Sequence, residues 1–586
     1  MPKTGSTLPK ALRDAFRACR YHFALAAGFS AGVNILYFAP PLYMMQVYDR
    51  VIPTAGEMTL VFVSIIALLA LMTLAALDAL RQSILARMAA RLDRLLSTPV
   101  VLAQFAGRHV SALAPGVRQL DMFRAAMTGP GALAVLDAPW TPLFLIVVFV
   151  IHPWLGVFVL AGAVLLVAIT ALSQIRLRSD LIAADSAAAV ASARTEASAA
   201  LAGAGRALGM QRALAVKHTG ERGDASRKAF SATVGAGAVG SLTKFLRLVL
   251  QSGVLGLGAY LAIEGQISAG AVFAASILAA RTLQPIEQLV GGWRSLIQGL
   301  AAYESLRRAL ASAENEGPRT PLPAPAGVIE VQQLIIAVGD GRAPPVVKGV
   351  SFRVGPGEVA AIVGPSGAGK STLGQAIVGA IAAQAGVVRI DGGDIRHWDP
   401  ELLGPHIGYL PQEVGLFEGT IADNISRFRR WRGEAPEELG ARIVTAAKAA
   451  GAHELIQRLP LGYDTPLGPG GRGVSGGQAQ RIALARAMFD EPAILVLDEP
   501  NAFLDSEGEQ ALLRSLEAVK ARGGSAIVIA QRVGVLAACD RMIVMRDGRI
   551  ELDGPRDQVL MNLRATQVGQ TRPATAVEPP KPEEAA

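Results

Sequence analysis

About six long apolar runs occupy the first half of this 586-residue chain and limit what it can fold into. Each is about as long as the ~20 residues that a helix needs to cross a bilayer. The whole chain is 51% hydrophobic with positive mean hydropathy, which is too apolar for an ordinary soluble enzyme. The sequence therefore predicts an all-α membrane domain in a lipid bilayer, with spans near residues 22–48, 58–80, 132–151, 154–174, 238–263 and 268–290.

Basic residues orient the expected spans. Segment 1–20 carries five Lys and Arg residues against the single acid Asp14, so we expect the N-terminus in the cytoplasm. The Arg-rich segments 81–131 and 175–237 are expected on the same side, where they form helical stalks below the membrane. The net charge of +8 is then explained by membrane topology. No aromatic-basic pattern or zinc spacing accompanies it, so we expect no nucleic-acid partner.

The first apolar run is too long for a signal-peptide core and lacks a small-residue cleavage site. We therefore expect it to remain in the protein as an anchor. The two cysteines, Cys19 and Cys539, make no C-x-x-C pair and fall in segments expected in the cytoplasm. This pattern predicts neither a structural disulfide nor a cysteine metal site.

A glycine-rich segment lies between the strand-like run 358–363 and the helix-like run 373–381 and has the pattern G-x-x-x-x-G-K-[ST]. Its glycines let successive backbone N–H groups point at a β-phosphate, and the following helix start adds partial positive charge. Lys370 is expected to bridge the β- and γ-phosphates, and Ser371 to hold Mg²⁺. The pattern predicts that ATP is bound by Gly364, Pro365, Ser366, Gly367, Ala368, Gly369, Lys370, Ser371 and Thr372.

Composition divides the chain into five segments. The Pro-rich stretch within 311–327 reads as a linker, and short β-rich runs alternate with helical patterns from 328 to 568. The last residues are rich in Pro, Glu and Ala and are expected to be disordered. The predicted organisation is a cytoplasmic segment (1–20), a six-helix transmembrane domain (21–310), a linker (311–327), an α/β phosphate-loop nucleotide-binding domain (328–568) and a tail (569–586). The sequence shows no internal repeat, so one chain is expected to supply one membrane domain and one nucleotide-binding domain.

A second motif reads V-S-G-G-Q-A-Q-R from Val474 to Arg481. Ser475 followed three residues later by Gln478 is a capping box, so a helix whose free N–H groups can hold an anion is expected here. The segment resembles the LSGGQ motif of the ATP-binding cassette family in four of five positions, with Val474 in place of Leu. Three other segments resemble that family's motifs in the same order: YLPQ at 409–412 its Q-loop, ILVLDEP at 494–500 its Walker B, and NAFLD at 501–505 its D-loop.

The resemblance implies roles for particular residues. Asp498 would position Mg²⁺ directly or through water, Glu499 would act as general base, and Gln412 would contact the Mg²⁺ and the attacking water. The family's head-to-tail dimer implies that a second copy of the chain completes each site. The residues implied to reach nucleotide from outside the phosphate loop are Ser475, Gly476, Gly477, Gln478 and Asp505.

Three positions depart from the family pattern. Gln531 stands where a switch histidine is expected, and an amide can donate a hydrogen bond to a γ-phosphate but cannot take up a proton as imidazole does. Slow hydrolysis is therefore expected. The adenine-stacking aromatic is missing from residues 331–339, and Pro469 replaces a glutamate that contacts the membrane domain in related exporters.

Several membrane-domain segments resemble type I protein-secretion ATPases of the protease and lipase exporter kind: 39–53, 137–143, 152–156, 244–247 and 281–288. With the cassette motifs, the resemblance covers roughly residues 20–565. It implies a homodimer in the inner membrane, a membrane-fusion adaptor, an outer-membrane channel and a secreted polypeptide with an uncleaved C-terminal signal. Arg281 and Glu287 lie in or near a span, where an ionisable group either faces a partner or water-filled path or snorkels to the helix end.

Two other functions remain open from the sequence. One is an exporter of small molecules or lipids with the same architecture. The other is a regulatory subunit that binds ATP with little turnover, which Gln531 and Pro469 favour and which the intact Lys370, Asp498 and Glu499 oppose. The segment before the first span is too short for a peptidase domain, so cleavage of a leader peptide is not expected.

Overall fold

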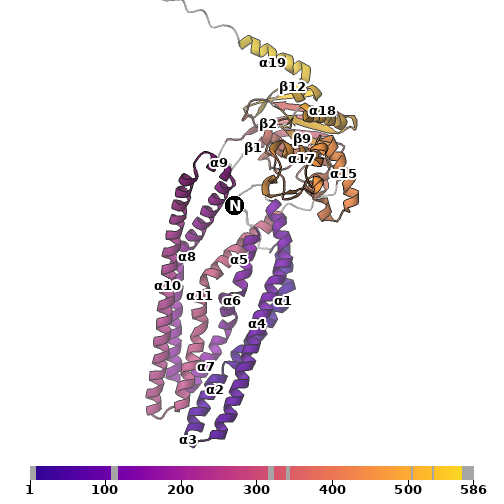
Figure 1. Cartoon of the computed structure of the whole chain (residues 1–586). Helices are drawn as coiled ribbons and strands as arrows, with labels where there is room; N and C mark the ends of the chain where they lie inside the picture. The colour runs from indigo at the N-terminus through magenta and orange to yellow at the C-terminus, as the bar shows by residue number, and fades with distance from the viewer. Residues whose placement is uncertain are drawn as a thin grey trace, which may run out of the picture. The chain divides into compact units, whose positions relative to one another are not determined.

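The computed structural model describes residues 8–106, 116–314, 322–337, 344–502, 504, 506–530 and 534–570. The chain divides into two compact units, Met1–Glu316 and Gly317–Ala586. The described part of the first unit is helical, and the second combines helices with sheets (Figure 1).

The first unit supplies six segments of described residues that are long and apolar enough to cross a membrane, as predicted: Lys10–Thr54, Glu57–Phe105, Pro130–Ile151, Pro153–Ser173, Gln211–Ile263 and Ala269–Glu314. Its helices are α1 (Lys10–Leu36), α2 (Ala39–Gln46), the π-helical turn η1 (Val47–Val51), α3 (Ile52–Thr54), α4 (Glu57–Ala106), α5 (Val117–Thr128), α6 (Pro130–Asp137), the 3-10 turn η2 (Ala138–Trp140), α7 (Thr141–Ile151), α8 (Pro153–Ala200), α9 (Ala202–Ala207), α10 (Gln211–Ile263) and α11 (Ala269–Glu314).

Several helices are longer than the apolar runs that predict them. α4, α8 and α10 contain 50, 48 and 53 residues. At ~1.5 Å per residue each is about 75 Å long, which is more than twice the ~30 Å of bilayer hydrocarbon. α1 begins at Lys10, inside the segment predicted to precede the first span, because Leu12, Ala15 and Cys19 form a buried face one turn after another.

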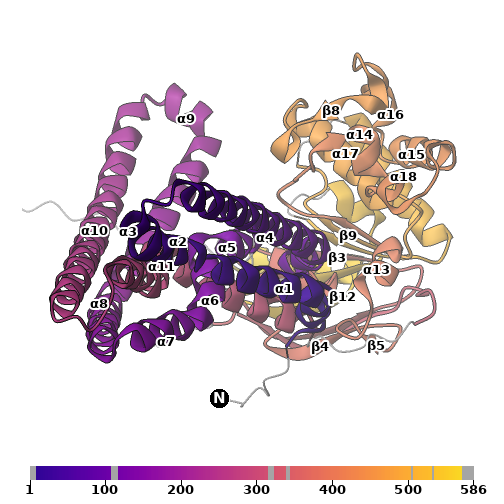
Figure 2. The same cartoon turned by 90° about the horizontal axis from the view of Figure 1, so that it is seen from below.

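α11 lies at the centre of the helical unit, where it contacts α2, α4, α5, α6, α7, α8 and α10 (Figure 2). Small residues permit this packing. A Cβ on Gly292 of α11 would lie 2.6 Å from the backbone nitrogen of Gly131 in α6, and a Cβ on Gly299 would lie 2.2 Å from the Cβ of Ala126 in α5. α6 and α11 therefore cross backbone against backbone.

A buried ionic cluster joins α1, α4 and α6. The Arg81 side chain is 6% exposed, and its guanidinium donates to Asp137 Oδ1 at 2.6 Å and to Asp78 Oδ1 at 2.6 Å. Asp137 Oδ1 also accepts hydrogen bonds from Ser30 Oγ at 2.5 Å and Asn34 Nδ2 at 2.9 Å. These contacts compensate the charges where three helices meet.

The π-helical turn η1 is fastened to the start of α11. Asp49 Oδ2 accepts a hydrogen bond from Ser268 Oγ at 2.6 Å, and Asp49 Oδ1 accepts one from the Gly270 backbone N–H at 2.7 Å. The ring of Tyr48 stacks on Phe273 with centroids 4.3 Å apart. Asp49 thereby satisfies one free N–H group of a helix start with a negative charge.

The two ionisable residues singled out in the last span both have partners. The Arg281 guanidinium lies 3.4 Å from the ring centroid of Tyr37, and Glu287 Oε2 forms an ion pair with Arg247 Nε at 2.9 Å. Of the two alternatives for these residues, the structure shows side chains that face partners: Tyr37 just after α1, and Arg247 in α10.

The second unit contains a six-stranded sheet of order β12-β11-β3-β10-β9-β6. Adjacent strands are parallel except for β12, which pairs antiparallel with β11. A four-stranded antiparallel sheet of order β2-β1-β4-β5 and a two-stranded sheet of β7 and β8 complete the described strands. Their bounds are β1 (Ile329–Ile336), β2 (Val347–Val354), β3 (Val359–Val363), β4 (Ala385–Ile390), β5 (Gly393–Asp394), β6 (Ile407–Leu410), β7 (Gly419–Thr420), β8 (Pro466–Leu467), β9 (Ile494–Asp498), β10 (Ser525–Ile529), β11 (Arg541–Arg546) and β12 (Arg549–Pro555).

The α-helices of this unit are α12 (Lys370–Ile377), α13 (Pro400–Leu403), α14 (Ile421–Ile425), α15 (Pro436–Ala449), α16 (His453–Gln457), α17 (Gly476–Met488), α18 (Ser506–Ala521) and α19 (Arg556–Gln570). Thus α11 extends into the predicted linker and α19 into the first two residues of the predicted tail. Residues 571–586 of that tail lie outside the described residues.

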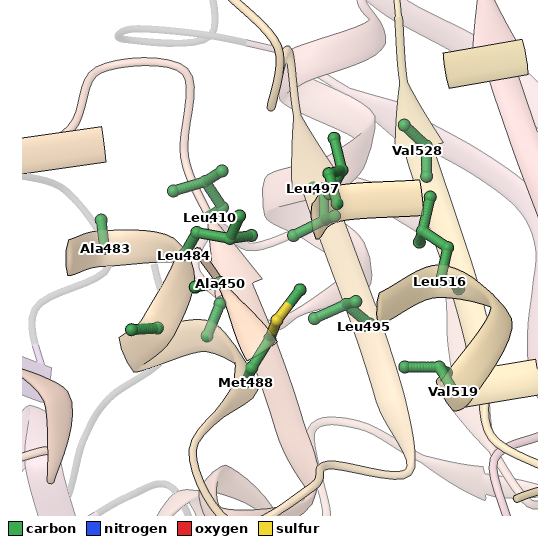
Figure 3. Packing of buried hydrophobic residues seen from close by; sticks show 14 of the residues in the cluster. Leu410, Ala450, Ala483, Leu484, Met488, Leu495, Leu497, Leu516, Val519 and Val528 are labelled. Carbon is green, nitrogen blue, oxygen red and sulfur yellow. The ribbon is translucent and has the colours of Figure 1, made fainter. Parts of the chain in front are cut away.

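Strand β9 is buried on both faces, as a central parallel strand requires. Leu495 and Leu497 point to the side where Leu484 and Met488 of α17 and Leu516 of α18 pack (Figure 3). Ile494 and Val496 belong to the hydrophobic cluster on the other side. This packing fixes the end of β9, which is formed by Asp498 and followed directly by Glu499.

Candidate ATP site

The phosphate loop connects β3 to α12 and requires glycine at specific positions. Gly364 has φ 153°, and a Cβ there would lie 2.1 Å from the carbonyl oxygen of Met545. Gly369 has φ 89°, and its Cβ would lie 2.9 Å from the carbonyl oxygen of Val346. The loop therefore follows a path that other residues do not fit.

Lys370 is the first residue of α12, and its side chain is held over the loop. Nζ donates to the carbonyl oxygens of Gly364 and Pro365, at 2.9 Å each. Burial lowers the pKa of Lys370, and the nearby carboxylates of Glu499 and Asp498 partly oppose this shift. The ammonium group is thus partly desolvated, which strengthens its interaction with a bound phosphate.

Three oxygen-bearing side chains gather at the start of α12 and the end of β9. Ser371 Oγ donates to Gln412 Oε1 at 3.2 Å. Asp498 is 3% exposed, and its Oδ1 has no hydrogen-bond partner in the described part of the chain. Burial, with a smaller contribution from Glu499, raises the pKa of Asp498, while the neighbouring Ser371 hydroxyl opposes this shift. Hydroxyl, amide and carboxylate oxygens suit a hard cation, so these residues fit Mg²⁺.

Glu499 follows β9 in a left-handed backbone conformation with φ 49°. Its backbone N–H donates to the carbonyl oxygen of Ile529 in β10 at 2.9 Å. Gln480 of α17 donates from Nε2 to the carbonyl oxygens of Glu499 at 3.3 Å and Pro500 at 2.8 Å. Gln480 was not predicted from the sequence, where its signal is a polar residue at a helix position surrounded by apolar ones.

The signature-like motif forms the predicted helix start. Ser475 is the N-cap of α17; its Oγ accepts from the Gln478 backbone N–H at 3.3 Å, and its own N–H donates to Gln478 Oε1 at 2.8 Å. Gly476 and Gly477 occupy the first turn. Among the described residues, no hydrogen bond or ion pair joins Ser475 or Gln478 to the phosphate loop.

Other predicted positions fall elsewhere. Gln531 and Asp505 lie outside the described residues. The region expected to carry an adenine-stacking aromatic, residues 331–339, begins in strand β1 (Ile329–Ile336). Residues 338 and 339 lie outside the described residues. Pro469 begins the 3-10 turn η6, Pro469–Gly471.

Comparisons with known proteins agree with this geometry. The ABC transporter family model matches residues 347–502, which contain the phosphate loop, Gln412, the signature-like motif and the acids after β9. The Type I secretion system ATP-binding protein PrsD of Rhizobium meliloti (strain 1021) is 38% identical over 563 residues, covering 94% of this chain and 95% of PrsD.

Two further relatives bear related names. The cyclolysin secretion/processing ATP-binding protein CyaB of Bordetella pertussis (strain Tohama I) is 32% identical over 559 residues, covering 90% of this chain and 75% of CyaB. The leukotoxin translocation ATP-binding protein LktB of Mannheimia haemolytica is 30% identical over 552 residues, with the same two coverages of 90% and 75%.

The fold also matches a solved structure. A bacterial Atm1-family ABC exporter with ATP bound superposes with a TM-score of 0.80 at 23% identity, covering 95% of this chain and 99% of that one. This likeness confirms the predicted all-α six-span domain followed by an α/β nucleotide-binding domain. The chain therefore belongs to the ATP-binding cassette exporters of type I secretion systems, and it is a multi-pass membrane protein that couples ATP hydrolysis to export.

Proposed function

We propose that this exporter is a homodimer in the inner membrane that moves a polypeptide with an uncleaved C-terminal signal out of the cell. It works with a membrane-fusion adaptor and an outer-membrane channel. The observation that supports this most strongly is the relation to PrsD, which spans nearly the full length of both chains at 38% identity. The names of CyaB and LktB, which refer to secretion of cyclolysin and translocation of leukotoxin, point to the same class of cargo.

Hydrolysis follows from the charges around the γ-phosphate. Lys370 stabilises negative charge on the β- and γ-phosphates, while Ser371, Gln412 and Asp498 hold Mg²⁺, which supplies further charge neutralisation when bound. Glu499 takes a proton from a water molecule, whose oxygen attacks the γ-phosphorus as the bond to the β-phosphate oxygen breaks. ADP leaves with the electron pair of that bond.

The second copy completes the site in this proposal. Ser475, Gly476, Gly477 and Gln478 of one copy reach the γ-phosphate held by the other, with the α17 N-terminus directed at the anion. Such a site is suited to export because ATP joins the two copies and hydrolysis separates them. Gln531 donates an amide hydrogen bond to the γ-phosphate and lowers turnover, since it cannot exchange a proton as histidine does.

ATP hydrolysis by the purified protein in lipid tests whether the protein turns over ATP with Glu499 as the general base. Wild type is compared with Glu499→Gln and Gln531→His in the presence of Mg²⁺. We expect Glu499→Gln to abolish turnover while ATP still binds, and Gln531→His to raise it. Turnover that survives Glu499→Gln would remove Glu499 as the base. A wild type that binds ATP but turns over no faster than Glu499→Gln would instead favour a regulatory subunit.

Cargo is tested separately. The C-terminal segment of a polypeptide encoded beside this exporter is fused to a soluble reporter, and the reporter outside producing cells is measured with and without the adaptor and channel. Export is expected only with all components and with active Glu499. Export or ATPase stimulation by lipids or small molecules, but not by such polypeptides, would contradict the proposed cargo.

A further inference from the structure

One buried glutamine connects the signature helix to the turn that carries the base. Gln480 of α17 is 3% exposed, and its Nε2 donates to the carbonyl oxygens of Glu499 and Pro500, at 3.3 and 2.8 Å. Both acceptors are carbonyls, so only the NH₂ end of the amide fits there. The contact therefore fixes the orientation of the amide as well as the position of the turn.

The turn that Gln480 holds contains an unfavourable backbone conformation at Glu499, which we expect to relax when the hydrogen bonds from Gln480 are lost. Glu499 has φ 49°, a left-handed conformation that is unfavourable for a residue with a Cβ. Its N–H is fixed by Ile529 of β10, and Gln480 fixes the carbonyl side. A rotation of this backbone toward negative φ would swing the Cα–Cβ bond and move the carboxylate away from the attacking water.

The same helix begins at the signature-like motif. Ser475 caps α17, and Gln480 follows within the first two turns of that helix. Because an α-helix is stiff over such a short length, a displacement of the helix start is passed to Gln480. The helix start and the base turn are thus joined by one hydrogen-bonded element within a single chain.

We propose that Gln480 is a positioning residue for Glu499, and that through α17 it connects the base of one ATP site to the helix start that binds nucleotide in the other. This inference rests on the proposed function, in which Glu499 is the base and the signature-like motif acts on the second copy. Gln480 itself touches no reacting atom. Its loss affects the rate of hydrolysis and leaves ATP binding by the phosphate loop intact.

The test uses the full-length exporter in lipid with Mg²⁺-ATP. Gln480→Met preserves length and apolar contact but cannot donate a hydrogen bond. We expect kcat to fall about 10- to 100-fold, as for a misplacement of about 1 Å, with KM and ATP affinity within about two-fold of wild type. Ile443→Val, a buried change in the neighbouring helix α15, is the control and should leave all three values unchanged.

A second variant separates positioning from packing. Gln480→Glu keeps the shape of the side chain, and only its protonated form can donate a hydrogen bond to a carbonyl oxygen. Burial raises the pKa of a carboxyl group, so the kcat of Gln480→Glu relative to wild type should rise as the pH is lowered from about 8 to about 6. A purely structural role gives a ratio that does not change with pH.

Three further outcomes would overturn the inference. Wild-type kcat in Gln480→Met would show that the turn holds without the glutamine. If Gln480→Met lowers ATP affinity by the same factor as kcat, or clearly lowers the melting temperature, Gln480 would be assigned to folding. A wild type without turnover above Glu499→Gln would remove the proposed function and this inference together, and the wild-type measurement alone identifies that case.

Discussion

The glycines of the phosphate loop differ in what they tolerate. Gly364 combines positive φ with a position where a Cβ would lie 2.1 Å from the Met545 carbonyl oxygen, whereas Gly367 has φ 82° and open space around it. We therefore expect Gly364→Ala to abolish ATP binding, because the loop must leave β11 to accept the methyl group. Gly367→Ala should weaken the folded loop by only about 1–2 kcal/mol, the usual left-handed penalty.

Binding of a fluorescent ATP analogue to the full-length protein measures both variants. Circular dichroism controls for overall folding. Equal affinities for Gly364→Ala and wild type would show that the approach to Met545 is not required.

Cys539 is expected to be an inert thiol. It is 3% exposed, its Sγ donates to the Val535 carbonyl oxygen at 3.6 Å, and burial, assisted by Asp540, raises its pKa to about 12. A raised pKa leaves about one thiolate in ten thousand at pH 8, and the thiolate is the reactive form. In a Cys19→Ser background, maleimide should label Cys539 only after denaturation. Rapid labelling of the folded protein at pH 8 would contradict the burial.

At the residue level, local patterns predict well and distant contacts do not. The Ser475–Gln478 capping box was predicted from a spacing of three residues, and the structure confirms it. Gln480 reaches a turn 19 residues away along the chain, which no periodicity encodes. The contact exists because α17 and β9 pack side by side, and that is a tertiary fact.

Among the helices, the Arg81 cluster stabilises the packing of α1, α4 and α6. Arg81→Met leaves the partly buried carboxylates of Asp78 and Asp137 without their cation, and the loss of stability is at most about 3–5 kcal/mol, the value for a fully buried pair. We expect a markedly lower melting temperature in detergent micelles, with partial recovery in Arg81→Met/Asp137→Asn. Arg87→Met, at an exposed position of the same helix, serves as the control. No recovery in the double variant would mean that packing rather than charge dominates.

The number of spans and the continuation of α4, α8 and α10 as stalks into the Arg-rich segments 81–131 and 175–237 were predictable, whereas the end points of these helices were not. Apolar runs of about 20 residues mark the spans, since a bilayer demands them. Beyond the bilayer, α4, α8 and α10 continue without a comparable contrast in hydropathy, so the runs do not show where they end. The ionic cluster was equally hidden, because Ser30, Arg81 and Asp137 are far apart in sequence and meet only when three helices pack.

For the whole transporter, the proposed site composed of two copies makes a prediction about mixed dimers. When one copy carries Lys370→Ala and the other Ser475→Arg, one of the two sites retains both an intact phosphate loop and an intact helix start. When one copy carries both changes and the other is wild type, each site loses one of them. We expect about half of the wild-type sites to be active in the first dimer and none in the second.

Differently tagged copies, co-purified and reconstituted, allow both dimers to be assayed for ATP hydrolysis. Each variant alone as a homodimer is the control and should be inactive. Activity in the second mixed dimer and none in the first would show that each chain hydrolyses ATP with its own residues.

At this scale the sequence predicted the architecture and the exporter subfamily, and full-length relatives confirm both. It could not identify the cargo, because in the proposed function recognition depends on surfaces formed by two copies and by other components. The motif residues report on ATP, which every member of the family shares, and carry little information about what is moved.

The crossing of α6 and α11 at Gly131 and Gly292 limits how this exporter can change over generations. A Cβ on Gly131 would lie 2.6 Å from Leu296 Cγ, the flexible end of a side chain, whereas a Cβ on Gly292 would meet backbone atoms that cannot move aside. A larger residue at position 131 can therefore be accommodated if residue 296 becomes smaller. No side chain next to position 292 can compensate in this way. In a library of all single substitutions, position 292 should be intolerant in every background, while the tolerance of position 131 should depend on residue 296.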